Sequence, residues 1–100
     1  MTKKSSDLIE ILIFLEKLIE ERKNFNNKTS YTKKLLEGNH KKIVQKVAEE
    51  SAEVVIEATL KDKEKTIYES ADLIYHLLVM WNKLDINLSD IARELKKRNQ

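Results

Sequence analysis

Residues 46 to 76 constrain the fold most, because they contain two helix-forming segments that carry the same acidic spacing. Both segments are rich in Ala, Leu, Ile, Val and Glu and contain neither Pro nor Gly, so each is expected to form an uninterrupted α-helix. Glu50 and Glu53 lie three residues apart in the first segment, and Glu69 and Asp72 repeat that spacing in the second. Residues three apart are neighbours on one helix face. Each segment therefore presents a pair of carboxylates on one face.

A bend between the two segments would bring the carboxylates face to face. Positions 61–62 suit the bend, since the aspartate there can cap the start of the next helix. Antiparallel pairing about this bend places Glu50 level with Asp72 and Glu53 level with Glu69. Four carboxylates flanked by small and apolar residues would repel one another and lose hydration unless a cation lay between them. Oxygen ligands favour a hard divalent cation, and we expect Mg²⁺.

Other interpretations of these acids remain open. Glutamate is a strong helix former, so single Glu-x-x-Glu pairs are common on solvated helix faces. The matched levels and the apolar neighbours favour acids that face inward. A carboxylate-bridged di-iron bundle is disfavoured, because it needs a Glu three residues before a His on two helices, and only Glu37 and His40 have that spacing.

Charged residues near the acidic pairs suggest further roles. Glu49 borders the same face, and a fifth ligand would overcharge the site, so we expect it to act as a base or an outer group unless it is simply exposed. Lys42 and Lys46 precede the acids by one and two turns. Their ammonium groups would either neutralise a phosphoanhydride substrate or form salt bridges with Glu49 or Glu50.

His76 follows Asp72 by one helical turn on the same face. It is expected to orient a metal ligand, to contact substrate, or to be a half-buried histidine that is hydrogen-bonded in the bundle. The aromatic residues Tyr68, Tyr75 and Trp81 are expected in the core or at an interface.

The composition of the whole chain indicates an all-α domain. Its 100 residues include one Gly and no Pro, and strand-like alternation is weak. We expect one domain over residues 1 to 100, because 41% apolar content supports a single core. The lack of cysteine excludes disulfides and thiolate chemistry. A net charge of +2, no signal sequence and no long apolar run predict a cytoplasmic protein without nucleic-acid or membrane partners.

Helical periodicity and capping signals predict about five helices. A polar loop is expected over residues 24 to 29, and Gly38 is expected at the C′ position that ends the second helix. After a frayed start over residues 1–4, the expected helices run from a cap at Ser5 or Ser6 to about Lys23, from Tyr31 to Glu37, from a cap at Asn39 to Thr59 or Leu60, from about Lys63 to Leu84, and from Asn87 or Ser89 to Arg98.

These patterns resemble the signature of the all-α nucleoside triphosphate pyrophosphatases, the MazG-like superfamily, in which Glu-Glu-x-x-Glu is followed by Glu-x-x-Asp. Longer blocks resemble, more narrowly, the phosphoribosyl-ATP pyrophosphohydrolases of histidine biosynthesis. The likeness covers roughly residues 8 to 98. It departs from the family where the loop before Ser30 lacks Pro and Gly, and where Ala48 and Ser51 replace common Gly and Ala residues. The matching blocks are Ser30-Tyr31-Thr32-x-x-Leu35-Leu36, the segment from Lys42 to Val54, and Glu69-x-Ala71-Asp72-Leu73-x-Tyr75-His76-Leu77-Leu78.

The resemblance implies hydrolysis of phosphoribosyl-ATP between its α and β phosphates, giving phosphoribosyl-AMP and pyrophosphate. It also implies a helical bundle that is built round an antiparallel hairpin and completed by homodimerisation. The chain has the length of a stand-alone member, so we expect the cyclohydrolase found fused in some relatives to be a separate protein. Carried over by position, Glu50, Glu53, Glu69 and Asp72 would hold Mg²⁺, Glu49 would orient or deprotonate the attacking water, Lys42 and Lys46 would neutralise the leaving pyrophosphate, and Ser30, Tyr31, Thr32 and His76 would bind the substrate.

Two other functions fit the sequence. A house-cleaning pyrophosphatase of the same superfamily would act on a nucleoside triphosphate such as dUTP or dCTP. A non-catalytic helical dimer would bind a protein partner, but it would not require acids that match in level across the hairpin.

Overall fold

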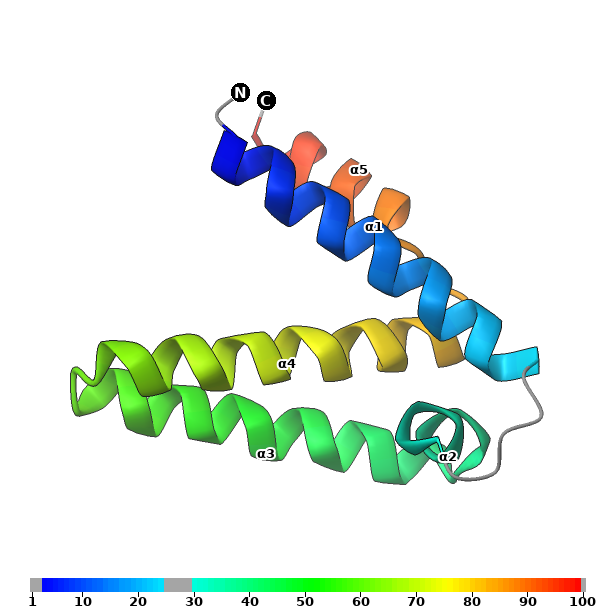
Figure 1. Cartoon of the computed structure of the whole chain (residues 1–100), viewed down its shortest axis with the longest axis horizontal. Helices are drawn as coiled ribbons and strands as arrows, with labels where there is room; N and C mark the ends of the chain where they lie inside the picture. The colour runs from blue at the N-terminus through cyan, green and yellow to red at the C-terminus, as the bar shows by residue number, and fades with distance from the viewer. Residues whose placement is uncertain (1–2, 25–29, 100) are drawn as a thin grey trace.

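The chain is all-α, as the sequence predicts. The computed structural model describes residues 3–24 and 30–99, and it contains no strand within those ranges. The described helices are α1 (Lys3–Asn24), α2 (Tyr31–Glu37), α3 (His40–Thr59), α4 (Lys63–Lys83) and α5 (Leu88–Arg98) (Figure 1). None of these helices is long and apolar enough to cross a membrane.

The predicted antiparallel hairpin is formed by α3 and α4, which lie side by side along their length (Figure 1). Lys61 closes α3 in a left-handed conformation with φ of 58°. The Asp62 side chain then accepts a hydrogen bond of 3.0 Å from the backbone N–H of Lys65 and caps α4. This local chemistry confirms the expected bend.

A small core joins the first four helices at one end of the hairpin. α1 crosses the C-terminal half of α4 and diverges from it toward its own N-terminus, while α2 packs beside the start of α3 (Figure 1). Half-buried side chains such as Tyr75, Trp81 and Leu88 pack against the buried ones. The buried apolar residues of this core are Ile19 of α1, Leu35 of α2, Ile43 of α3, and Leu78 and Val79 of α4.

One predicted helix boundary is wrong, and another differs by one residue. α1 begins at Lys3, so neither Ser5 nor Ser6 is its N-cap, because nothing in residues 3–6 breaks a helix. α4 ends at Lys83, with Leu84 as its C-cap. Of the two candidate caps for the last helix, Asn87 is the one used. The predicted loop at residues 25–29 lies outside the described residues.

Gly38 does not adopt the left-handed conformation that usually ends a helix with glycine. It has φ of −73° and ψ of 175°, whereas the left-handed positions of the described chain are Lys61 and Asp85. The last carbonyls of α2 are instead satisfied by the Lys83 ammonium group. Glycine still suits the position, since a Cβ at Gly38 would lie 3.0 Å from the carbonyl oxygen of Lys34, a tight contact.

Many apolar side chains remain exposed outside the core. Residues 7–11 of α1 are all exposed, and so are Ile67, Ala71 and Ile74 of α4. The apolar residues of these two helices are therefore only partly buried by this chain. The exposed apolar residues of α1 are Leu8, Ile9, Ile11, Ile13 and Phe14.

Candidate active site

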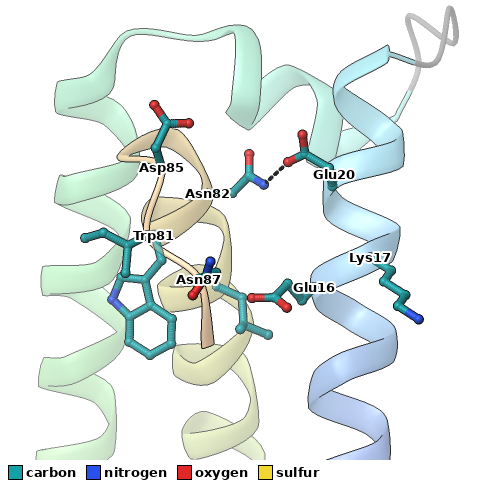
Figure 2. Close-up of a pocket in the computed structure, with 9 residues that line it drawn as sticks. Glu16, Lys17, Glu20, Trp81, Asn82, Asp85 and Asn87 are labelled. Carbon is teal, nitrogen blue, oxygen red and sulfur yellow. Dashed lines mark hydrogen bonds between the residues drawn. The ribbon is translucent and has the colours of Figure 1, made fainter. Parts of the chain in front are cut away.

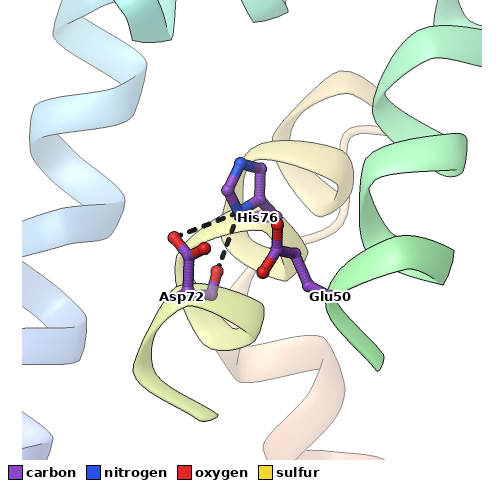
Figure 3. Close-up of side chains that lie close together, drawn as sticks. All are labelled: Glu50, Asp72 and His76. Carbon is purple, nitrogen blue, oxygen red and sulfur yellow. Dashed lines mark hydrogen bonds and ion pairs between the residues drawn. The ribbon is translucent and has the colours of Figure 1, made fainter. Parts of the chain in front are cut away.

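The hairpin brings together Glu50, Asp72 and His76 halfway along its length. Each offers one possible metal-ligand atom, and these atoms all lie within 4.8 Å of one another. Figure 3 shows Glu50 reaching from α3 toward Asp72 and His76, which come from successive turns of α4. The predicted level pairing of Glu50 with Asp72 is thus present in the structure.

The Glu50 carboxyl group is buried against a second carboxylate. Its residue is only 8% exposed. Burial raises its pKa from the ordinary value of 4.5, and both a hydrogen bond to Asp72 and the charge of Asp72 raise it further. His76 and Lys46 act in the opposite direction, and the Lys46 ammonium lies 3.8 Å from a Glu50 oxygen. A hydrogen bond between two carboxyl groups requires a shared proton, and a bound cation would offset the repulsion between the two carboxylates once that proton is lost.

His76 is held at both ring nitrogens. Its Nδ1 lies 2.8 Å from the backbone carbonyl oxygen of Asp72, and because a carbonyl only accepts, Nδ1 carries the proton. Nε2 lies 2.8 Å from the Tyr31 hydroxyl and accepts from it when the ring is neutral. With 3% exposure and both nitrogens engaged, His76 is a hydrogen-bonded link between α2 and Asp72. As arranged here it has no free lone pair for a metal ion.

The predicted substrate-binding residues Ser30, Tyr31 and Thr32 dock α2 onto its neighbours. Ser30 Oγ accepts from Arg22 Nη1 of α1 at 2.9 Å and from the backbone N–H of Lys33 at 3.3 Å. Thr32 is buried and its hydroxyl is hydrogen-bonded to Tyr75 of α4. Tyr75 was expected in the core or at an interface, but Arg22 was not singled out, because nothing in its spacing relates it to α2.

Tyr31 lies at the edge of the acidic group. Burial raises the pKa of its hydroxyl, and Lys46, Asp72, Glu50 and Glu49 are all close enough to change that pKa. Its residue is nevertheless 50% exposed. The tyrosine therefore combines a hydroxyl anchored on His76 with a side chain that is still open to a ligand.

The other predicted metal ligands do not join the group. Glu53 is exposed and Glu69 is half-buried, and neither belongs to the cluster of three. Glu49 and Lys42 are also exposed, and Lys46 is half-buried beside Glu50. Ala52 and Ala71, two of the small residues expected to bury the four acids, are exposed as well.

A cavity of about 340 Å³ lies elsewhere, between α1 and the C-terminal end of α4 (Figure 2). Asn82 donates from Nδ2 to Glu20 across this cavity at 2.6 Å, and the nearby Glu16 carboxylate accepts from the backbone N–H of Leu88 at 2.7 Å. The cavity contains none of the predicted site residues. Its lining is Glu16, Lys17, Glu20, Leu78, Trp81, Asn82, Asp85, Ile86 and Asn87.

Comparisons with known proteins find matches over most of the chain. The family model described as phosphoribosyl-ATP pyrophosphohydrolase matches residues 12–99. The phosphoribosyl-ATP pyrophosphatase of Clostridium acetobutylicum is 47% identical over 94 residues, which are 94% of this chain and 86% of that protein. The histidine biosynthesis bifunctional protein HisIE of Campylobacter jejuni is 46% identical over 97 residues, which are 97% of this chain and 46% of that protein. The corresponding protein of Vibrio cholerae is 46% identical over 86 residues, or 86% of this chain and 41% of that protein. The chain thus spans less than half the length of these bifunctional relatives.

Proposed function

Because the chain belongs to the phosphoribosyl-ATP pyrophosphohydrolase family, we propose that it hydrolyses phosphoribosyl-ATP to phosphoribosyl-AMP and pyrophosphate, a step of histidine biosynthesis. The observation that carries the proposal is the Glu50–Asp72 pair, which faces across the hairpin at the levels that the sequence predicts. Hydrolysis of a phosphoanhydride needs a concentrated negative site that can hold a cation beside the phosphates. We place the reaction in the cytoplasm.

The donor chemistry of the pair fits a hard divalent cation, and we propose Mg²⁺. Carboxylate oxygens are the ligands this ion prefers, and it usually takes one or two carboxylates and fills its remaining positions with water and substrate phosphates. Glu50 and Asp72 would therefore be the main protein ligands, with Glu53 and Glu69 as outer or additional ones. When bound, the ion would polarise the phosphates and lower the pKa of an attacking water.

The remaining site residues divide the other tasks. Glu49 is exposed directly beside Glu50, where it would accept a proton from the attacking water. Lys46 and the more exposed Lys42 would neutralise the pyrophosphate as it leaves. Tyr31 would contact the substrate with its open side, while Ser30, Thr32 and His76 keep α2 in place through their hydrogen bonds.

We also propose that the protein works as a homodimer. Apolar residues of α1 are exposed where this helix diverges from α4, and among them Phe14 is 57% exposed (Figure 1). A second copy would cover apolar side chains that this chain leaves in water.

The test is pyrophosphate release from phosphoribosyl-ATP with and without Mg²⁺. Glu50→Gln and Asp72→Asn keep the side-chain shapes and each remove one charge, so we expect each to lower kcat by about 100-fold or more. Glu64→Gln is the matched control, because Glu64 is an exposed acid in the first turn of α4. Glu53→Gln and Glu69→Gln, measured in parallel, separate a four-acid site from a site built on Glu50 and Asp72 alone.

The outcomes are distinct. Metal-dependent release that collapses in the Glu50 and Asp72 variants, but not in Glu64→Gln, supports the proposal. Turnover of dUTP or dCTP in place of phosphoribosyl-ATP would assign the protein to the house-cleaning branch. No turnover of any nucleotide would contradict the enzymatic function altogether.

A further inference from the structure

The Lys83 side chain ties the last turn of α4 to the C-terminal end of α2. Its ammonium Nζ donates to the carbonyl oxygens of Leu35 at 3.1 Å, Leu36 at 3.2 Å and Gly38 at 2.5 Å. An ammonium group has three donors, and here three carbonyls of a helix end accept them. The positive charge also lies at the negative end of the helix dipole.

The opposite end of α2 is tied to α4 near the acidic group. Tyr31 is hydrogen-bonded to His76, Thr32 is hydrogen-bonded to Tyr75, and His76 in turn holds the backbone of Asp72. α2 has only seven residues, which is too short for a helix that is stable by itself. Its position therefore depends on tertiary contacts, which are the burial of Leu35 in the core and the hydrogen bonds at its two ends.

We propose that Lys83 is a positioning residue for the active site: it holds α2 so that the Tyr31 hydroxyl stays on His76, beside Glu50 and Asp72. This inference rests on the proposed function, in which Tyr31 contacts the substrate. Without Lys83, only a fraction of molecules would have α2 in place, and the apparent affinity for substrate falls by that fraction. The chemical step in the molecules that do bind is unchanged.

The test compares Lys83→Met, which keeps most of the stem and loses all donors, with Lys83→Arg, which keeps the charge and the donors. We expect Lys83→Met to raise KM for phosphoribosyl-ATP by about tenfold and to change kcat by less than about threefold, as a tenfold drop in the competent fraction requires. Lys83→Arg should restore most of the affinity. Thermal unfolding of both variants checks that they are folded.

A double-mutant cycle with Tyr31→Phe separates positioning from general stability. If Lys83 acts through Tyr31, removing the hydroxyl should raise KM in the parent but add little in the Lys83→Met background. The ¹⁵N chemical shifts of the His76 ring provide a readout without substrate, since loss of the Tyr31 hydrogen bond should shift Nε2 in Lys83→Met.

Each result decides something. An active parent together with normal KM and unchanged His76 shifts in Lys83→Met would overturn the role of Lys83 alone. Additive effects of the two substitutions would reduce Lys83 to a stabilising residue and would likewise overturn the proposal. An inactive parent would overturn the proposed function, and with it the effect of Lys83 on substrate binding, whatever the His76 shifts show.

Discussion

At the scale of single residues, Glu50 has the most informative environment. Burial and the facing Asp72 carboxylate raise its pKa, so the folded protein holds a proton there that the unfolded chain releases at lower pH. Such a group stabilises the fold below the pKa of the unfolded state, and this stabilisation is lost as the pH rises through the raised folded value. At neutral pH and without metal, Glu50 therefore works against folding.

This reasoning predicts a pH-dependent difference between the parent and Glu50→Gln. Near pH 4 the metal-free proteins should melt alike, because Glu50 is protonated in the parent. As the pH rises above the ordinary value of 4.5, the parent should fall below Glu50→Gln, since the amide stays neutral. Thermal melting in EDTA between pH 4 and pH 8 measures the difference. Equal melting curves at pH 8 would contradict the expectation that the ionised Glu50 carboxylate destabilises the metal-free fold.

Added Mg²⁺ should reverse that order. At 100 times its Kd, an ion bound only to the folded state stabilises by about 2.7 kcal/mol. The parent should gain this stability at pH 8, and Glu50→Gln should gain much less. Glu64→Gln is the control and should behave like the parent.

At the scale of the helices, local sequence signals predicted which helices exist and in what order. They predicted the residues at which the helices begin and end less well. The hairpin, the caps at Ser30, Asn39 and Asp62, and the Glu50–Asp72 pairing follow from short-range patterns. The partners of α2 do not, because Lys83 lies 45 residues from Gly38 and nothing local relates them. Glu53 and Glu69 match in level but lie farther from the core, where pairing alone does not turn side chains inward.

α3 and α4 end in the same type of turn. In each turn a non-glycine residue adopts the left-handed conformation, Lys61 after α3 and Asp85 after α4. In α3, Lys61 N–H donates to Ala58 O at 3.0 Å and Asp62 N–H donates to Glu57 O at 3.1 Å. This is the Schellman pattern, which usually has glycine at the position of Lys61. A side chain there is strained, because its Cβ crowds the neighbouring carbonyl oxygen.

Lys61→Gly should therefore stabilise the protein, by about 0.5–1 kcal/mol once the greater freedom of glycine in the unfolded chain is included. Lys61→Ala removes the same exposed side chain but keeps the Cβ, so it should leave stability nearly unchanged. Urea unfolding of both variants makes the comparison. A gain in Lys61→Ala as large as that in Lys61→Gly would assign the effect to the lysine charge.

At the scale of the whole molecule, the composition predicted one small helical core, and the described chain has one. The sequence did not reveal how few of its apolar side chains one chain buries. Leu8, Ile11, Ile67 and Ile74 are apolar residues of helices that the sequence predicts, yet all four are exposed. An apolar stripe shows that a face needs covering, but it does not say whether the cover comes from the same chain or from another copy.

The proposed homodimer predicts a mass of twice the 11.8 kDa chain in sedimentation equilibrium. Phe14→Glu places a charge in the exposed apolar surface of α1, which should shift the protein toward the monomer and lower its thermal stability. Glu21→Gln, at an exposed position of the same helix, is the control and should leave the mass unchanged. A monomeric parent at high micromolar concentration would refute the dimer.

The one-sided core has a mechanical consequence for the hairpin. Among the described residues, no apolar side chain is buried in α3 beyond Ile43 or in α4 before Leu78, so the two helices are secured by the core at one end and by the turn at Lys61 at the other. Glu50 and Asp72 lie in the middle of the hairpin, between these two supports. We expect bending of this span to change the distance between the two carboxylates more than it changes the core.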